Sequence, residues 1–378
     1  MTAGTDAWRN WRAFARQQPE LENVHEELHS DRFFVGGPID LGPYQMTGVV
    51  RAGRPQASEA IGPAVRVRLG VHDNLMPVIL VDGELAEANS DAYHGGTIGD
   101  ELASLVSLTL GVRLRNAGTV QISGIHADAE PSAPIHLEVP VLARPGPAGV
   151  EHIPASLARR AGLDGLGRLD SYAALSSDSQ IELARAARAY ASALWWANED
   201  PNQSWLQMVT AVEIAATHSV ALMGTAPQLL EANWPELWAA LESAEESVRD
   251  RVSKLLSPQV KATQKFVEFL ARYAPAPPPI RPLFGALEWG DMRAHVRLIY
   301  GHRSKALHAG KPFPLPMLSE PRREEDGAVQ EVPYGHNAGG LGGVWDAAES
   351  PMLLATFEHI TRGALLRWWD ELPRHDPA

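Results

Sequence analysis

The 378-residue sequence contains no cysteine. Disulfides, thiolate zinc sites and cysteine nucleophiles are therefore excluded, because each of them needs a thiol. The sequence also lacks a run of about 18 apolar residues, which a membrane-spanning helix would require. The N-terminal segment has no apolar core of signal-peptide length. These absences predict a cytoplasmic protein with no membrane contact.

Positive charge is scarce: the sequence has 33 lysines and arginines but 46 aspartates and glutamates, which gives a net charge of -13. Such a balance argues against a chain coated by nucleic acid or held on an anionic membrane. No zinc-type spacing such as His-Glu-x-x-His occurs, so we expect neither a metal nor a cofactor. The composition is otherwise that of a globular protein, and its length predicts two domains.

The N-terminal part has the mixed pattern of an α+β domain. Residues 1–30 predict a short helix or a mobile lead-in, and we place the domain at residues 31–145. A helix is expected between Asp100, which can cap it, and Gly111, which can end it. Alternating or short continuous apolar runs predict strands. These runs lie at residues 64–69, 77–81 and 135–139.

The C-terminal part reads as a bundle of helices. Glycine and proline near residue 145 mark a linker, which we place at residues 146–170. Residues 171–372 form the expected all-α domain, with a long loop at residues 310–349. Helical patterns lie at residues 179–198, 204–224, 235–256 and 260–273, from about Glu288, and after Ser350-Pro351.

One segment of this acidic chain carries positive charge only. Between Met292 and Phe313 there is no aspartate or glutamate. A solvent-exposed helix face normally mixes charges of both signs, so a one-signed segment suggests a site for an anion such as phosphate. The segment contains Arg293, His295, Arg297, His302, Arg303, Lys305, His308 and Lys311.

The same segment carries a resemblance to a known family. RSKALH, from Arg303 to His308, resembles the R-x4-6-H motif of the HEPN superfamily. With Tyr300, Ser304, Lys305 and Gly310 it is similar to the pattern Y-x-x-R-S-K-x-x-H-x-G of the Apea-like HEPN group. In many catalytic HEPN proteins asparagine, aspartate or histidine follows the arginine, whereas serine is usual in the Apea-like group.

A second stretch supports this resemblance. WLQMVTAVEIA, at residues 205–215, resembles an early helix of the Apea-like group, with Val212-Glu213 in place of Leu-Glu. The resemblance covers roughly residues 170–370 and implies a HEPN-like helical bundle. Five residues on a regular helix rotate two side chains about 140° apart, so Arg303 and His308 do not converge within one regular helix. Either the helix loosens between them or a second element completes the site, and a second copy of the same helix in a homodimer would do so.

The resemblance implies a metal-independent endoribonuclease that leaves a 2′,3′-cyclic phosphate, acting as a regulated toxin or in antiviral defence. Histidine suits proton transfer at neutral pH, and arginine grips phosphate oxygens. Arg303 and His308 would be catalytic. Supporting or RNA-positioning roles are implied for Tyr300, His302, Ser304, Lys305 and Glu213.

Two alternatives stay open. In one, the basic motif binds RNA, a nucleotide or a partner protein without catalysis. In the other, it is structural, and Glu213 pairs with a buried arginine such as Arg303. The N-terminal domain has no assigned activity, and a regulatory ligand or protein could act there.

Overall fold

The computed structural model describes residues 4–49, 62–73, 80–81, 84–85, 95–124, 151–154, 160–221, 224–334, 337–338 and 343–374. The chain divides into two compact units. The first contains Met1–Arg144, Pro154–Trp195 and Trp369–Ala378, and the second contains Pro145–Ile153 and Trp196–Trp368. None of the described helices is both long and apolar enough to cross a membrane.

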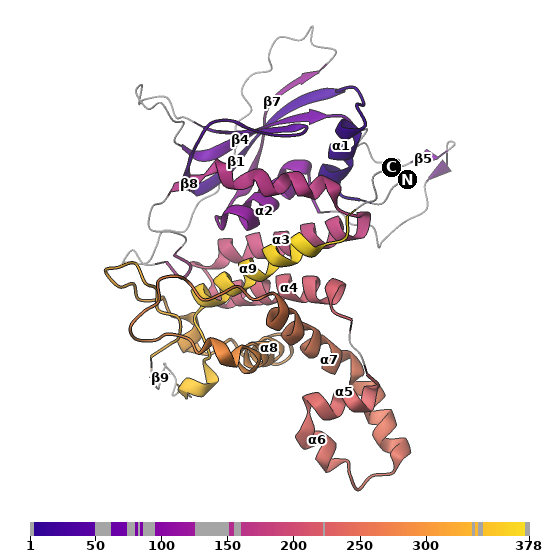
Figure 1. The fold of residues 1–378 in the computed structure, drawn as a ribbon, viewed down its shortest axis with the longest axis vertical. Coiled ribbons are helices and arrows are strands. Elements are labelled where there is room, and N and C mark those ends of the chain that lie inside the picture. The colour runs from indigo at the N-terminus through magenta and orange to yellow at the C-terminus, as the bar shows by residue number, and fades with distance from the viewer. Residues whose placement is uncertain are drawn as a thin grey trace. The chain divides into compact units, whose positions relative to one another are not determined.

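The first unit contains an antiparallel sheet and the second is mostly helical, as the sequence predicted (Figure 1). The first unit also includes helix α3 (Ser177–Trp196), which the sequence analysis placed in the helical domain. Hydrogen bonds explain this grouping. The Trp195 indole Nε1 donates to the Leu114 carbonyl at 3.0 Å, and Gln180 accepts from the Thr5 amide at 3.2 Å. The sequence pattern predicts this helix but does not indicate which other elements it packs against.

The main sheet has the strand order β2-β3-β4-β1-β7, and β8 pairs in parallel with the end of β1. The predicted strand at residues 64–69 is confirmed within β4. Of the run at residues 77–81 only β5 (Leu80–Val81) is described, paired with β6 (Glu84–Leu85), and residues 135–139 lie outside the described residues. The main strands are β1 Glu22–Val35, β2 Ile39–Leu41, β3 Tyr44–Gly48, β4 Gly62–Val71, β7 Arg115–Gly124 and β8 Arg160–Gly162.

Strand alternation separates the two faces of this sheet. On β4, Val65, Val67 and Leu69 are buried, whereas the arginines between them point to the opposite face. The helices α1 (Asp6–Ala15) and α2 (Ile98–Leu110) belong to the same unit and contact each other. Trp11 of α1 packs edge-on against Tyr44 at 5.2 Å. The predicted lead-in is therefore an integral part of the first unit.

Helix α2 ends at Gly111, as predicted, where a φ of 68° favours glycine. Its start differs from the expectation. Thr97 is the N-cap, and Asp100 is the third helical residue, whose carboxylate accepts from the Thr97 amide at 2.9 Å. The two side chains form a capping box, which satisfies two amides that would otherwise lack a partner.

Glu101 of α2 is 4% exposed and accepts a hydrogen bond from the Ala7 amide at 3.1 Å. Burial raises the pKa of Glu101 from its ordinary value of 4.5 to about 7, outweighing the hydrogen bonds that lower it. A raised pKa in the folded state stabilises the fold most when the carboxyl is protonated. This stabilisation is complete below pH 4.5 and is lost as the pH rises through about 7.

We therefore expect Glu101→Gln to flatten the dependence of unfolding free energy on pH between about 4.5 and 7, because an amide does not titrate. Urea unfolding across this range measures the effect. Glu22→Gln, at an exposed position of the same unit, is the control and should retain the wild-type slope. An unchanged slope in Glu101→Gln would contradict the assignment.

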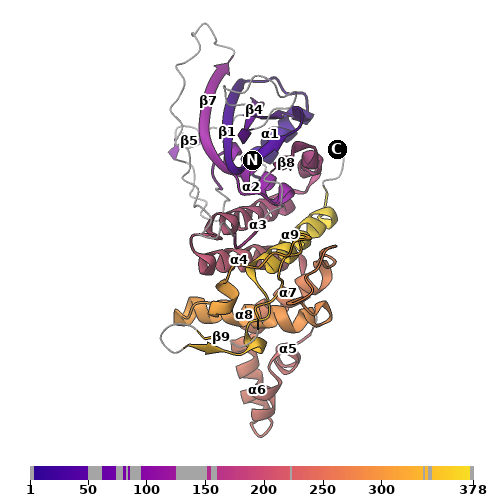
Figure 2. The ribbon, with the colours of Figure 1, turned by 90° about the vertical axis from the view of Figure 1, so that its left-hand side faces the viewer.

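The second unit is built around the long helix α7 (Glu246–Tyr273). Helices α5 (Ala226–Asn233) and α6 (Pro235–Ala240) lie beside its N-terminal half (Figures 1 and 2). The helix does not continue into the proline-rich segment after α7, as predicted. Short 3-10 turns are η2 (Trp289–Asp291), η3 (Leu315–Leu318) and η5 (Ala347–Glu349), and β9 (Asn337–Ala338) pairs with β10 (Val344–Trp345). The helices are α4 Pro201–Ser219, α5 Ala226–Asn233, α6 Pro235–Ala240, α7 Glu246–Tyr273, α8 Met292–Ala309 and α9 Leu354–Glu371.

Some predicted helix boundaries are wrong. The pattern at residues 235–256 is not one helix, because α6 ends at Ala240 and α7 continues through the region predicted as separate. The chain reversal between α6 and α7 lets their apolar residues pack in one cluster. That cluster contains Leu229, Leu230 and Val260, with Trp234, Leu237, Trp238, Leu241, Val252 and Leu256 packed against it.

The predicted loop at residues 310–349 is partly ordered by the aromatic core of the second unit. Trp205 of α4 stacks between Phe313 and Phe357, at centroid distances of 5.2 and 4.9 Å. Its indole Nε1 donates to the Met317 carbonyl at 3.1 Å. Phe357 comes from α9, which begins at Leu354 rather than at Ser350-Pro351. The start of the loop is thus fixed against two helices.

Candidate functional site

Helix α8 carries the basic segment and the RSKALH motif. Val296, Ile299 and Tyr300 form its buried face, and it contacts both α4 and α7. Gly310 ends the helix with a φ of 63°, which confirms the predicted helix stop. The motif therefore occupies the last turns of a regular helix.

Carboxylates from neighbouring helices pair with two of the arginines in this segment. Glu268 of α7 forms an ion pair with Arg293 through both carboxylate oxygens, the longer contact being 2.9 Å from Nη2 to Oε2. Glu213 of α4 pairs with Arg303. The charge segregation along the sequence is therefore partly cancelled in space, because acids distant in sequence lie beside α8.

Arg303, Glu213 and Tyr300 form one polar cluster. The Arg303 Nη2 donates to Glu213 Oε2 at 2.5 Å, and the Tyr300 hydroxyl donates to Glu213 Oε1 at 2.9 Å. The guanidinium carbon also lies 5.6 Å from the centre of the Tyr300 ring. Both charged side chains are 20% exposed, so this is a largely buried pair that joins α4 to α8.

Burial dominates the electrostatics of this cluster. It raises the pKa of Glu213, although Arg303 and Tyr300 act in the opposite direction. It also raises the pKa of Tyr300, and the neighbouring carboxylate of Glu213 adds to that shift. Tyr300 is therefore a hydrogen-bond donor that orients Glu213, and the phenol stays protonated at neutral pH.

The Arg303 guanidinium is held firmly but is not saturated. An arginine side chain has five N–H donors, of which only Nη2 has a hydrogen-bond partner among the described residues. Its Nε is buried and has no such partner. Arg303 therefore keeps N–H groups that can donate hydrogen bonds to the oxygen atoms of an anion.

His308 does not join this cluster. It is exposed in the last turn of α8, and the helix between it and Arg303 is regular. Five residues on a regular helix rotate the two side chains about 140° apart, as the sequence analysis expected. One copy of the chain therefore does not bring Arg303 and His308 together.

The remaining motif residues differ in their environments. His302 donates from Nε2 to the Glu349 carbonyl at 2.7 Å, and burial lowers its pKa. A neutral, hydrogen-bonded imidazole of this kind is suited to anchoring the end of η5 and poorly suited to donating a proton to substrate. Ser304 is partly buried and Lys305 is exposed.

Comparison of the chain with models of known protein families finds no match, and neither the curated proteins nor the solved structures yield one. The resemblance of α8 to the HEPN motif therefore rests on its own residues. Within the part of the chain that the structure describes, no group of three or more potential metal ligands occurs.

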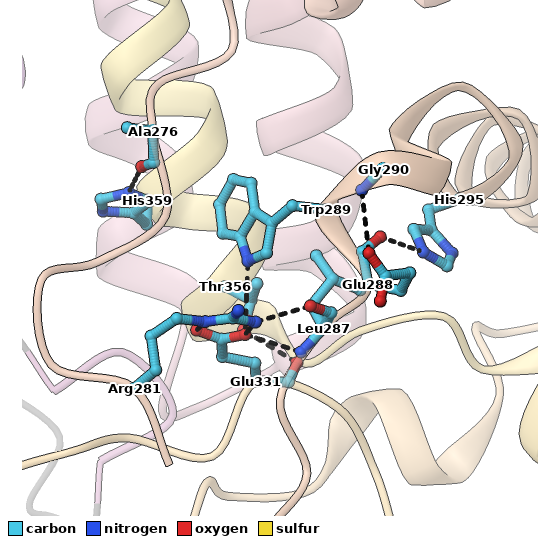
Figure 3. Close-up of polar contacts among 10 residues, drawn as sticks. All are labelled: Ala276, Arg281, Leu287, Glu288, Trp289, Gly290, His295, Glu331, Thr356 and His359. Carbon is cyan, nitrogen blue, oxygen red and sulfur yellow. Dashed lines mark hydrogen bonds and ion pairs between the residues drawn. The ribbon is translucent and has the colours of Figure 1, made fainter. Parts of the chain in front are cut away.

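A second polar cluster of the same unit was missed from the sequence. Figure 3 shows Glu331 at its centre. The Glu331 side chain is 4% exposed. Arg281 donates to both carboxylate oxygens, at 3.1 Å from Nε and 2.7 Å from Nη2, and the Leu287 amide donates at 2.6 Å. The Trp289 indole lies 3.4 Å from the same oxygen as Leu287.

The backbone of Glu331 extends this cluster to two further segments. Its amide donates to the Gly285 carbonyl at 2.9 Å, and its carbonyl accepts from Thr356 Oγ1 at 2.8 Å. Glu331 thus ties the segment before α8 to the start of α9. Its only sequence signal is a lone glutamate within a predicted loop, which does not indicate burial.

Proposed function

We propose that the second unit is a HEPN-type ribonuclease domain that cleaves RNA without a metal when two copies associate. The observation that carries this proposal is the state of Arg303, which Glu213 and Tyr300 hold in place while part of its guanidinium lacks a partner among the described residues. Preorganised donors of this kind stabilise the charge that develops on a phosphorane.

In this mechanism His308 transfers protons. Its imidazole is exposed at the end of α8, where a second copy of the helix could approach. One histidine accepts the proton of the RNA 2′-hydroxyl, and the histidine of the other copy protonates the departing 5′-oxygen. Arg303 binds the non-bridging phosphate oxygens. The products are a 2′,3′-cyclic phosphate and a free 5′-hydroxyl.

The test is incubation of labelled RNA with purified protein in EDTA. We expect cleavage that falls about a hundredfold or more in His308→Ala, the usual contribution of a proton-transfer group. A similar loss is expected in Arg303→Ala, which removes donors that stabilise the developing charge. His295→Ala, on the same helix, is the matched control and should stay active. Circular dichroism checks that each variant folds. Equal activity in all four proteins would exclude this site.

Mixing wild type with a growing excess of His308→Ala tests the dimer. The mechanism uses one histidine from each copy, so a mixed dimer holds only one of the two proton-transfer groups and should be inactive. Activity per wild-type chain should therefore fall as the excess of the variant grows. Activity that stays proportional to the amount of wild type at every ratio would contradict a site that is shared between two copies.

A second candidate function is a non-catalytic module that binds RNA through the same helix. It is favoured by the separation of Arg303 and His308 within one chain and by the Glu213–Arg303 ion pair. This alternative predicts intact RNA in EDTA, together with RNA retention that weakens with salt and with Arg303→Ala.

A further inference from the structure

The first unit has a hollow of about 270 Å³ on the face of the sheet opposite to Val65, Val67 and Leu69. Its volume is close to the lower end of the range for small-molecule sites, which begins at about 300 Å³. The lining is mostly polar. It includes His25 from β1, Gln45 and Thr47 from β3, and Arg66 and Arg68 from β4.

Strand register brings these side chains together. His25 and Gln45 are the direct neighbours of Arg68 on either side, and Thr47 is the neighbour of Arg66. Residues two apart on a strand point to the same face, so the two rows lie next to each other. Because a sheet is a rigid frame, the polar groups are positioned before any ligand arrives.

The two arginines keep unused donors. Arg66 donates from Nη2 to Glu27 at 2.6 Å, and Arg68 donates from Nη2 to Glu20 at 2.9 Å. Nη2 of Arg68 also donates to the second carboxylate oxygen of Glu20, at 3.1 Å. Nε and Nη1 of both arginines have no hydrogen-bond partner among the described residues, so they remain for a ligand. The side chains are 51% and 40% exposed, which leaves them accessible.

His25 adds a second, independent indication of an anion. Its Nδ1 is buried and has no hydrogen-bond partner in the described part of the chain. Burial, and then the charges of Arg66 and Arg68, lower its pKa. Two arginines beside this partly buried imidazole repel each other and destabilise a proton on His25, and an anion placed among them would relieve both effects.

We propose that this hollow binds the phosphate group of a small phosphorylated ligand. Arginine forks match the oxygens of a phosphate, and Thr47 and Gln45 can donate further hydrogen bonds. A small ligand fits better than a nucleic-acid strand, because no tryptophan, tyrosine or phenylalanine of the described residues lines the hollow for base stacking. This site lies in the first unit and is separate from the proposed ribonuclease site.

Titration calorimetry at low ionic strength tests the proposal, with inorganic phosphate and ribose 5-phosphate as probes and ribose as the uncharged control. We expect saturable binding of both phosphates and none of ribose. Arg66→Gln and Arg68→Gln should each weaken binding about tenfold, the loss expected for one charge-assisted contact. Arg160→Gln, an exposed arginine of the same sheet outside the hollow, should bind as the wild type does.

Glu20→Gln separates a binding effect from a folding effect. Glu20 competes with the ligand for Arg68, so its neutralisation should tighten phosphate binding at least about twofold. A misfolded protein would not gain affinity. Absence of saturable binding up to about 10 mM phosphate, or equal weakening by Arg160→Gln and Arg68→Gln, would overturn the proposal. Neither result would bear on RNA cleavage, because these variants leave α8 unchanged.

Discussion

Glu331→Ala should lower the free energy of unfolding of the second unit by about 3 kcal/mol, within the range for breaking a buried hydrogen-bonded charge pair. The carboxylate is 4% exposed and accepts hydrogen bonds from Arg281 and from the Leu287 amide. Its removal leaves that amide without its acceptor and opens a small cavity. Arg281 is 36% exposed, so its charge can regain water, which limits the loss.

Urea unfolding followed by tryptophan fluorescence measures this loss. Glu324→Ala is the matched control, because Glu324 also accepts from a backbone amide, that of Leu283 at 3.1 Å, but is only partly buried. We expect the control to lose less than about 1 kcal/mol. Equal losses in the two variants would show that the Glu331 cluster is not a stabilising centre of the unit.

Separate replacement of Glu213 and Arg303 should also be costly, at about 2–3 kcal/mol each, because each change leaves a largely buried charge without its partner. Glu213→Gln preserves side-chain size, and Arg303→Gln replaces the guanidinium by a shorter neutral amide. The double variant should lose clearly less than the sum of the two, giving a coupling energy of about 2 kcal/mol. Urea unfolding of the four proteins completes the cycle.

Tyr300→Phe is the graded control for this cycle. It removes one hydrogen bond to Glu213 and leaves both charges in place, so a loss of about 1 kcal/mol is expected. Strict additivity of the Glu213 and Arg303 variants would mean that the pair does not stabilise the fold. In that case loss of RNA cleavage in Arg303→Ala would report on catalysis alone.

Local sequence patterns predicted the elements whose residues interact over short distances. The alternation of Val65, Val67 and Leu69 identified β4, and Gly111 and Gly310 ended their helices as expected. The prediction of a helix after Ser350-Pro351 was also correct for the interior of α9, because its buried residues repeat with helical spacing. These predictions succeed because helix ends and strand alternation depend on residues that are close together in the sequence.

Features that depend on distant residues were harder to predict. The pairing of Arg303 with Glu213 was one of the alternatives, but only the fold brings α4 beside α8. The role of Glu331 had no local signal, since its partners lie between 22 and 50 residues away in sequence. The hollow around Arg66 depends on which residues of neighbouring strands lie opposite each other. A local sequence motif does not predict this register.

The division of α7 between two apolar environments has a consequence for the order in which the second unit unfolds. The N-terminal half contributes to the small cluster around Leu229, Leu230 and Val260, whereas Phe266 and Phe269 are fully buried further along. A cluster with few buried side chains opens at a lower free energy than a large core. The end formed by α5 and α6 can thus melt as a separate cooperative segment while the helix that carries Arg303 keeps its native packing.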